Sequence, residues 1–328
     1  MNGNRLLPVP MLALLIIHPL CGCLGGPRTD DELEIVLYGF SVKGEVFDNK
    51  IIPAFKEYWR ETFGEKVEFV TNYAGSGTIT NQVITGAPAE VMILSTEWDA
   101  MKLESEGLVS TDWHGFQNNG TISISPFVIM TRDGNPRSIR DIPDLSKSGT
   151  ELVWADPKTS GGACWAVFAV YGSELRRTGN DENATALLEG VLDNVISWQP
   201  SARKALSQFT LGFGDALLTY ENDALFSIGE GNDIEIVYPS CTIFSEHKAV
   251  IVDRNINDRE RELMEAFIEF LYTDEVQAYM VEYGFRSIYP DLNSDFPIIS
   301  DPFTVEYLGG WEQAHEEIIE GAYSDIRG

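Results

Sequence analysis

Three short stretches of this 328-residue sequence place serine, usually with glycine, between an expected strand and an expected helix. They hold Ser41, Gly75-Ser76-Gly77 and Ser160-Gly161-Gly162. Helix N-termini present unpaired N–H groups and a partial positive charge, glycine lets the backbone approach a ligand, and serine adds a hydroxyl donor. Such corners bind anions without a cationic side chain. One corner alone would indicate only a helix cap, but their recurrence along the chain favours anion binding.

Alternating strands and helices must position these corners. Strands are expected at residues 33–40, 66–73, 89–94, 151–157 and 233–239, and helices at 47–63, 79–86, 97–106, 163–175, 182–193 and 258–285. This order is typical of an α/β protein with largely parallel strands. We therefore expect ligand binding at the carboxyl ends of the strands.

Two further β-like runs, residues 124–136 and 247–253, connect one α/β unit to the other. They predict a two-lobed protein with two crossover strands and a cleft between the lobes. The expected division is 33–123 plus 248–328 for lobe I and 124–247 for lobe II.

Charge and composition exclude several partners. Lysine and arginine number 23 against 51 acidic residues, a net charge of -28, which argues against binding nucleic acid or anionic lipid surfaces. The four histidines lack metal-ligand spacing, so no metal or cofactor is expected. Cys164 and Cys241 are expected to be buried free thiols, although a disulfide between them stays an alternative.

The N-terminus predicts export. Arg5 precedes an apolar run broken by prolines, which is typical of a signal peptide over residues 1–22. The run ends in "LCGC", which resembles a bacterial lipobox and implies lipidation of Cys23. Residues 23–32 would then be a tether, anchoring the protein at the outer face of the cytoplasmic membrane. An ordinary cleaved signal with an incidental cysteine is the alternative.

Seven sequence blocks together resemble the sulfate- and thiosulfate-binding proteins that serve ABC importers. They are "AGSG" (74–77), "NP" (135–136), "PKTSGGACW" (157–165), "SAR" (201–203), "GFGDALLTYEND" (212–223), "EIVYPS" (235–240) and "GGWEQAHEE" (309–317). The resemblance implies a type II periplasmic-binding-protein fold that closes on one oxyanion outside the cytoplasm. It also implies a monomer that delivers the anion to importer permease subunits.

The same resemblance implies the ligand contacts. Its donors fall on backbone N–H groups at Ser41, Gly161, Gly162 and Ala202, on hydroxyls at Ser76 and Ser160, and on Tyr220 where the family has tryptophan. Two further departures are Cys164 in place of an arginine and Ser201 in place of a glycine.

Other ligands and one other class of protein stay open. Molybdate-binding relatives use a tyrosine donor in a comparable role, so molybdate or tungstate is an alternative ligand. Phosphate keeps a proton at neutral pH and needs an acceptor, which a phenol offers and an indole does not. A phosphatase or sulfatase with Ser160 as nucleophile would need a base in reach, for which Asp215 and Glu221 are the candidates. No Gly-x-Ser-x-Gly motif supports that reading.

Overall fold

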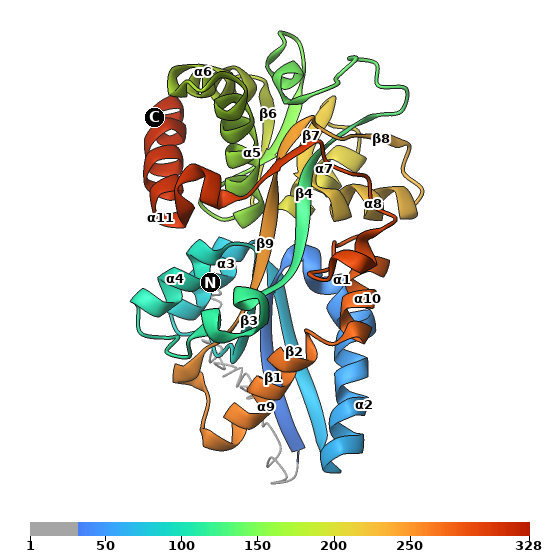
Figure 1. Ribbon diagram of the computed structural model, residues 1–328, viewed down its shortest axis with the longest axis vertical. Helices are drawn as coiled ribbons and strands as arrows, with labels where there is room; N and C mark the ends of the chain where they lie inside the picture. Colours follow the sequence, from blue (N-terminus) through green and yellow to red (C-terminus); the bar gives the residue numbers. More distant parts are fainter. Residues whose placement is uncertain (1–31) are drawn as a thin grey trace, which may run out of the picture.

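The computed structural model describes residues 32–328, so the expected signal peptide and the lipidation site at Cys23 lie outside the described residues. Two lobes stack along the long axis and are joined by two long strands, β4 and β9 (Figure 1). The strands are β1 (Glu32–Phe40), β2 (Lys66–Ala74), β3 (Val91–Leu94), β4 (Thr121–Arg132), β5 (Leu152–Ala155), β6 (Val195–Gln199), β7 (Ala216–Tyr220), β8 (Ile234–Val237), β9 (Cys241–Ile251) and β10 (Asp301–Phe303).

Helices cover both lobes. The α-helices are α1 (Gly44–Val46), α2 (Ile52–Phe63), α3 (Ser76–Ile84), α4 (Glu97–Ser105), α5 (Gly161–Thr178), α6 (Asp181–Leu192), α7 (Ala202–Thr210), α8 (Glu221–Gly229), α9 (Asp258–Phe270), α10 (Asp274–Glu282), α11 (Gly310–Ala314) and α12 (Ser324–Arg327). A 3-10 turn over Ser41–Lys43 and a π-helical turn over Phe47–Ile51 extend the first helical segment from β1 to Phe63. That segment ends at Gly64, whose φ of 73° suits glycine.

The sheet order confirms the predicted two-lobed α/β fold with two crossover strands. Its strands run in the order β2-β1-β3-β9-β4-β7-β5-β6. In lobe I, β1 pairs in parallel with β2 and β3, and in lobe II, β5 pairs in parallel with β6 and β7. The end of β9 pairs with β3 while the later half of β4 pairs with β7, so each crossover strand belongs to both lobes.

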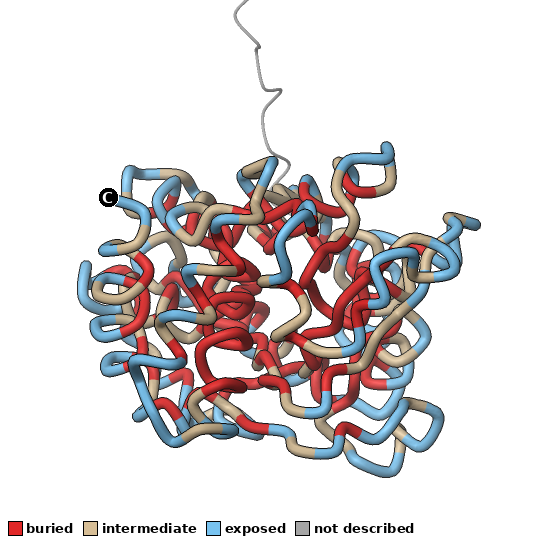
Figure 2. The backbone as a smooth tube through the Cα atoms, turned by 90° about the horizontal axis from the view of Figure 1, so that it is seen from above, coloured by how far each residue is buried: buried red, intermediate tan, exposed pale blue. Residues whose placement is uncertain are grey.

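Each lobe buries an apolar interior between its sheet and its helices. Buried backbone lies at the centre of the molecule and exposed backbone at its rim (Figure 2). In lobe I, the Phe55 ring of α2 lies 4.9 Å from the Phe267 ring and 5.4 Å from the Phe270 ring, centroid to centroid. This contact packs α9 against α2, since aromatic pairs favour such edge-to-face arrangements.

The C-terminal segment differs from the expected division, which placed all of 248–328 in lobe I. Helix α11 lies beside α5, in the lobe II half of the molecule (Figure 1). The Trp311 ring is 4.7 Å from the Trp165 ring of α5, and β10 pairs with the lobe II end of β9. The chain after α10 therefore returns to lobe II, where the Trp311 side chain is buried against Trp165.

The helix expected over 258–285 is also interrupted. It ends at Phe270 as α9 and restarts at Asp274 as α10. The Thr273 side chain accepts a hydrogen bond from Val276 N–H, which makes it an N-cap, and two acidic residues follow in the first turn. The N-cap at Thr273 therefore divides into two helices the segment that was expected to form one helix.

Candidate anion-binding site

A small cavity lies between the lobes. Its lining includes all seven residues that the sequence predicts as ligand contacts: Ser41, Ser76, Ser160, Gly161, Gly162, Ala202 and Tyr220. Phe40, Val42, Gly75 and Ser95 complete it. Residues far apart in the chain are thus brought together around one point.

Four helical segments begin at this cavity. The 3-10 turn begins at Ser41, α3 at Ser76, α5 at Gly161 and α7 at Ala202. The first N–H groups of a helix have no acceptor within it. Helices α3 and α5 begin earlier than the sequence predicted, and this brings Ser76, Gly161 and Gly162 into first turns.

The amides of α5 and α7 are available to a ligand. Among residues 32–328, the N–H groups of Gly161, Gly162 and Ala202 make no hydrogen bond to the protein. The caps Ser160 and Ser201 instead accept from N–H groups further into each helix, those of Ala163 and Lys204. The arrangement offers several free donors and two helix dipoles to a negative group.

Glycine is required at these corners because neighbouring groups approach closely, between the lobes at Gly161 and Gly75 and within lobe II at Gly162. A Cβ on Gly161 would lie 2.5 Å from Ser95 Oγ, and a Cβ on Gly162 would lie 2.9 Å from Tyr220 Cε2. A Cβ on Gly75 would lie only 2.2 Å from Thr159 O in the other lobe. The side-chain-free backbone lets the lobes meet and leaves the amides uncovered.

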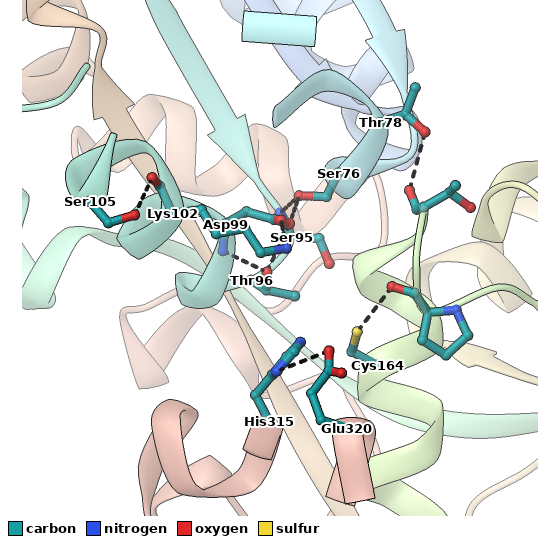
Figure 3. Close-up of polar contacts among 12 residues, drawn as sticks. Ser76, Thr78, Ser95, Thr96, Asp99, Lys102, Ser105, Cys164, His315 and Glu320 are labelled. Carbon is teal, nitrogen blue, oxygen red and sulfur yellow. Dashed lines mark hydrogen bonds and ion pairs between the residues drawn. The ribbon is translucent and has the colours of Figure 1, made fainter. Parts of the chain in front are cut away.

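The two predicted serine hydroxyls differ in their partners. Ser160 Oγ accepts from Ala163 N–H at 3.3 Å, which leaves its own proton free to donate. The Ser76 hydroxyl instead donates to Asp99 Oδ2 at 2.6 Å and accepts from Ser95 N–H at 3.1 Å (Figure 3). The proton of Ser76 is therefore committed to a carboxylate, and the free group at this position is its backbone N–H.

The carboxylate of Asp99 is buried beside the cavity and well satisfied. Its Oδ2 also accepts from Thr96 Oγ1 at 2.9 Å, and Lys102 Nζ lies 3.6 Å from Oδ1 (Figure 3). Cys164 stands nearby in place of the family's arginine. Burial, and to a smaller extent the charge of Asp99, raises the pKa of the Cys164 thiol to about 12. Cys164 and Cys241 are both free thiols; Cys164 is buried, as predicted, whereas Cys241 is half-buried.

Tyr220 is fully buried and reaches across to lobe I. Its hydroxyl lies 2.6 Å from Ser95 Oγ, and burial raises the pKa of the phenol well above its ordinary value. The backbone oxygen of Ser95 accepts from Trp165 Nε1 of α5 at 2.8 Å. Ser95 therefore links β3 to both β7 and α5. Sequence reasoning missed this residue, although it follows a strand and precedes a helix, as Ser41 does.

Two basic side chains, Lys43 and His247, are fully buried next to the Phe40 ring. Lys43 Nζ donates to Ser123 Oγ at 2.5 Å and lies 3.4 Å from the centroid of the Phe285 ring. His247 Nδ1 lies 2.8 Å from the same hydroxyl of Ser123, and the His247 ring is 4.9 Å from the Phe40 ring. Burial lowers the pKa of Lys43 well below its ordinary value, and it lowers that of His247 in the same way, with the charge of Lys43 adding to the effect.

The two candidate catalytic bases are engaged away from the cavity. Glu221 forms a two-point ion pair with Arg286, at 2.7 and 2.8 Å. Asp215 accepts from Glu151 N–H at 2.9 Å and pairs with Arg137 at 2.9 Å. Both carboxylates have structural partners and neither lines the cavity.

The described residues contain no cluster of histidine, cysteine, aspartate or glutamate able to hold a metal ion. Within the same range, no helix has the length and apolar character needed to cross a bilayer.

Fold and cavity define a class: a two-lobed protein with a small cavity between its lobes, lined by unpaired backbone N–H groups and by hydroxyls. The chain belongs to the bacterial extracellular solute-binding proteins, whose family description matches residues 44–286. The sulfate-binding protein of Synechococcus elongatus is 35% identical over 96% of this chain and 93% of its own length. The thiosulfate-binding protein of Pseudomonas aeruginosa is 31% identical over 83% of this chain and 86% of its own length.

Among solved structures, the sulfate-binding protein SubI from Mycobacterium tuberculosis H37Rv superimposes with a TM-score of 0.80 at 28% identity. That match covers 87% of this chain and 99% of the other. A molybdate-binding protein of Mycobacterium bovis is 30% identical, but over only 49% of this chain.

Proposed function

We propose that this chain binds sulfate, with thiosulfate as the runner-up, and presents it to an ABC importer. The observation that carries the proposal is the convergence of four helical N-termini on one cavity, with free N–H groups at Gly161, Gly162 and Ala202. Sulfate has no proton at neutral pH and accepts from every direction, which matches a set of donors. The sulfate- and thiosulfate-binding relatives support the same ligand class.

The contact set of this proposal follows from the cavity lining. Backbone N–H groups of Ser41, Ser76, Gly161, Gly162 and Ala202 donate to the anion, together with the hydroxyls of Ser160 and Tyr220. Each bond to a charged acceptor contributes about 1.5–3 kcal/mol. No cationic side chain lines the cavity among the described residues, so affinity comes from dipoles rather than from a counter-charge.

We infer binding rather than catalysis. The Ser160 hydroxyl has Ala163 N–H as its partner, whereas a nucleophilic serine needs a base. The buried carboxylate of Asp99 is held by the hydroxyls of Ser76 and Thr96. The relatives are named as binding proteins, in agreement with this inference.

Outside the cytoplasm, the protein would act as a monomer anchored through a lipid on Cys23. The apolar run ending in "LCGC" supports this part of the proposal. Mass spectrometry of protein purified from native membranes tests it: a modified N-terminal Cys23 is expected, and an unmodified chain starting elsewhere would refute the anchor while leaving the binding function untouched.

Isothermal titration calorimetry with the mature protein tests the ligand. The panel is sulfate, thiosulfate, molybdate, tungstate and phosphate, each at pH 8 in the same chloride buffer. Sulfate or thiosulfate should bind most tightly, and small-angle scattering should show a smaller radius of gyration at saturation. Molybdate or phosphate as the tightest ligand would replace sulfate in this proposal. No binding of any oxyanion would reject it.

A further inference from the structure

Ser95 and Tyr220 form a hydroxyl pair at the cavity, and the expected ligand contacts leave the role of Ser95 in this pair unexplained. Their oxygens are 2.6 Å apart, both residues are fully buried, and both line the cavity. Ser95 comes from the end of β3 in lobe I and Tyr220 from the end of β7 in lobe II.

Counting protons defines what this pair can do. Two hydroxyls carry two protons, and their mutual hydrogen bond uses one of them in either direction. The second proton has no other acceptor among the described residues. The same two oxygens keep lone pairs able to accept from a ligand O–H. The pair therefore offers the cavity one donor and at least one acceptor.

Neighbouring contacts hold Ser95 in place without using its hydroxyl. Its N–H donates to Ser76 Oγ at 3.1 Å, and its backbone oxygen accepts from Trp165 Nε1 at 2.8 Å. The Tyr220 ring packs 4.8 Å from the Phe127 ring. Removing either hydroxyl should leave the position of the other oxygen intact.

We propose that Ser95 is an oxyanion-binding residue which acts with Tyr220 as one shared-proton pair, donating to an unprotonated anion and accepting from a protonated one. The proposal rests on the proposed function. It widens the ligand class from sulfate to hydrogen-bearing tetrahedral oxyanions such as hydrogen phosphate, bound more weakly. A site of pure donors would leave the ligand O–H of such an anion unsatisfied.

Redundancy is the signature of a shared proton. In Ser95→Ala or Tyr220→Phe, the remaining hydroxyl still donates one proton outward, so sulfate affinity should fall by only a few-fold. In the double variant the pair itself has no outward donor left, and sulfate affinity should fall about 10- to 100-fold, the value of one charge-assisted hydrogen bond. Phosphate affinity should fall further than sulfate affinity in the double variant, because the acceptor is lost as well.

The experiment is a calorimetric double-mutant cycle on the full mature chain, with sodium sulfate and sodium phosphate as probes at pH 8. Ser227→Ala is the matched control, since Ser227 is equally buried but lies in α8 outside the cavity. Thermal melts of the anion-free variants verify folding. All substitutions only delete an oxygen, so the apolar packing around Tyr220 is kept.

Each result has one meaning. Singles near wild type with a much weaker double variant support the shared-proton pair. Large losses in each single variant that add in the double variant overturn the sharing, and wild-type affinity in all three overturns Ser95 as a binding residue. Wild-type protein that binds neither anion rejects the proposed function itself rather than this inference alone.

Discussion

Gly161→Ala tests whether the lobes must close on the anion. Gly161 opens α5 in lobe II, and a Cβ at this position would meet three atoms of lobe I. They are Ser95 Oγ at 2.5 Å, Ser95 Cβ at 2.8 Å and Thr96 Cγ2 at 2.8 Å. Ser95 is held by backbone hydrogen bonds to Ser76 and Trp165, so it cannot move aside cheaply.

The expected cost falls on binding rather than on folding. Inserting a methyl group into a packed contact costs about 1–3 kcal/mol. Because the clashing atoms belong to different lobes, opening the hinge removes the overlap, and only the closed state is penalised. Anion affinity should therefore fall about 5- to 150-fold. The anion-free protein should melt at the same temperature or slightly higher, since alanine stabilises a helix relative to glycine by about 0.4–1 kcal/mol.

Calorimetry with sulfate measures the anion affinity, and thermal melts with and without sulfate measure the stability of the protein. Gly229→Ala is the matched control: Gly229 lies at the end of α8, and a Cβ there meets no atom within 4 Å. The Gly229→Ala variant should bind sulfate with the same affinity as the wild-type protein. Wild-type affinity in Gly161→Ala would refute the inter-lobe contact. An equal loss of stability in the anion-free protein would show that the clash lies within a rigid body and is not relieved by opening.

Three further expectations follow. Ser160→Ala should weaken sulfate binding about 10- to 100-fold in calorimetry, whereas Ser76→Ala should mainly lower the melting temperature, because its proton goes to Asp99. Asp253→Asn should remove about 1–2 kcal/mol of stability in urea unfolding at pH 7, less than the full linkage value because solvent screens this partly exposed carboxylate. The folded pKa is about 2 against about 3.9 unfolded, so this stability is present above pH 4 and is lost as pH falls through 2. The pKa of Lys43 is lowered in the folded protein, so between that pKa and about 10.4 the unfolded chain binds more protons than the folded one. Wild-type stability should therefore rise with pH in this range, and Lys43→Met should abolish the part of the rise that Lys43 causes.

The predicted site could be found from sequence because its chemistry is local. The end of a strand, a Ser/Gly turn and the start of a helix occupy about ten consecutive residues, as around Ser160. A helix N-terminus can bind an anion wherever it lies in the fold. The fold rule that parallel strands end at one edge then brings separate corners together. For this reason Ser41, Ser76 and Ser160 meet at one cavity in the structure, whereas Ala202 and Tyr220, which also line it, were expected only from the family resemblance.

What sequence reasoning missed depends on contacts between distant residues. The Ser95–Tyr220 hydrogen bond joins residues 125 apart, and no local pattern reports it. The link from Ser76 to Asp99 likewise requires α3 and α4 to pack together, so the free hydroxyl expected at Ser76 is engaged. The placement of Trp311 in lobe II rests on a similar long-range contact with Trp165.

The proposed anion-binding site and the acidic chain are compatible because buried carboxylates, beside the cavity and away from it, each have their own hydrogen-bond or ion-pair partners. Asp99 is held by two hydroxyls and Lys102, Asp223 has Arg203 at 3.3 Å, and Glu221 pairs with Arg286. The remaining charge of the chain is mostly on its surface, where salt screens it beyond about 8–10 Å. An anion in the cavity therefore experiences the helix N-termini more strongly than the net charge of -28. Replacing Lys102 with Met should weaken anion binding more at low salt than replacing a lysine far from the cavity, because the unpaired negative charge of Asp99 would then lie next to the cavity.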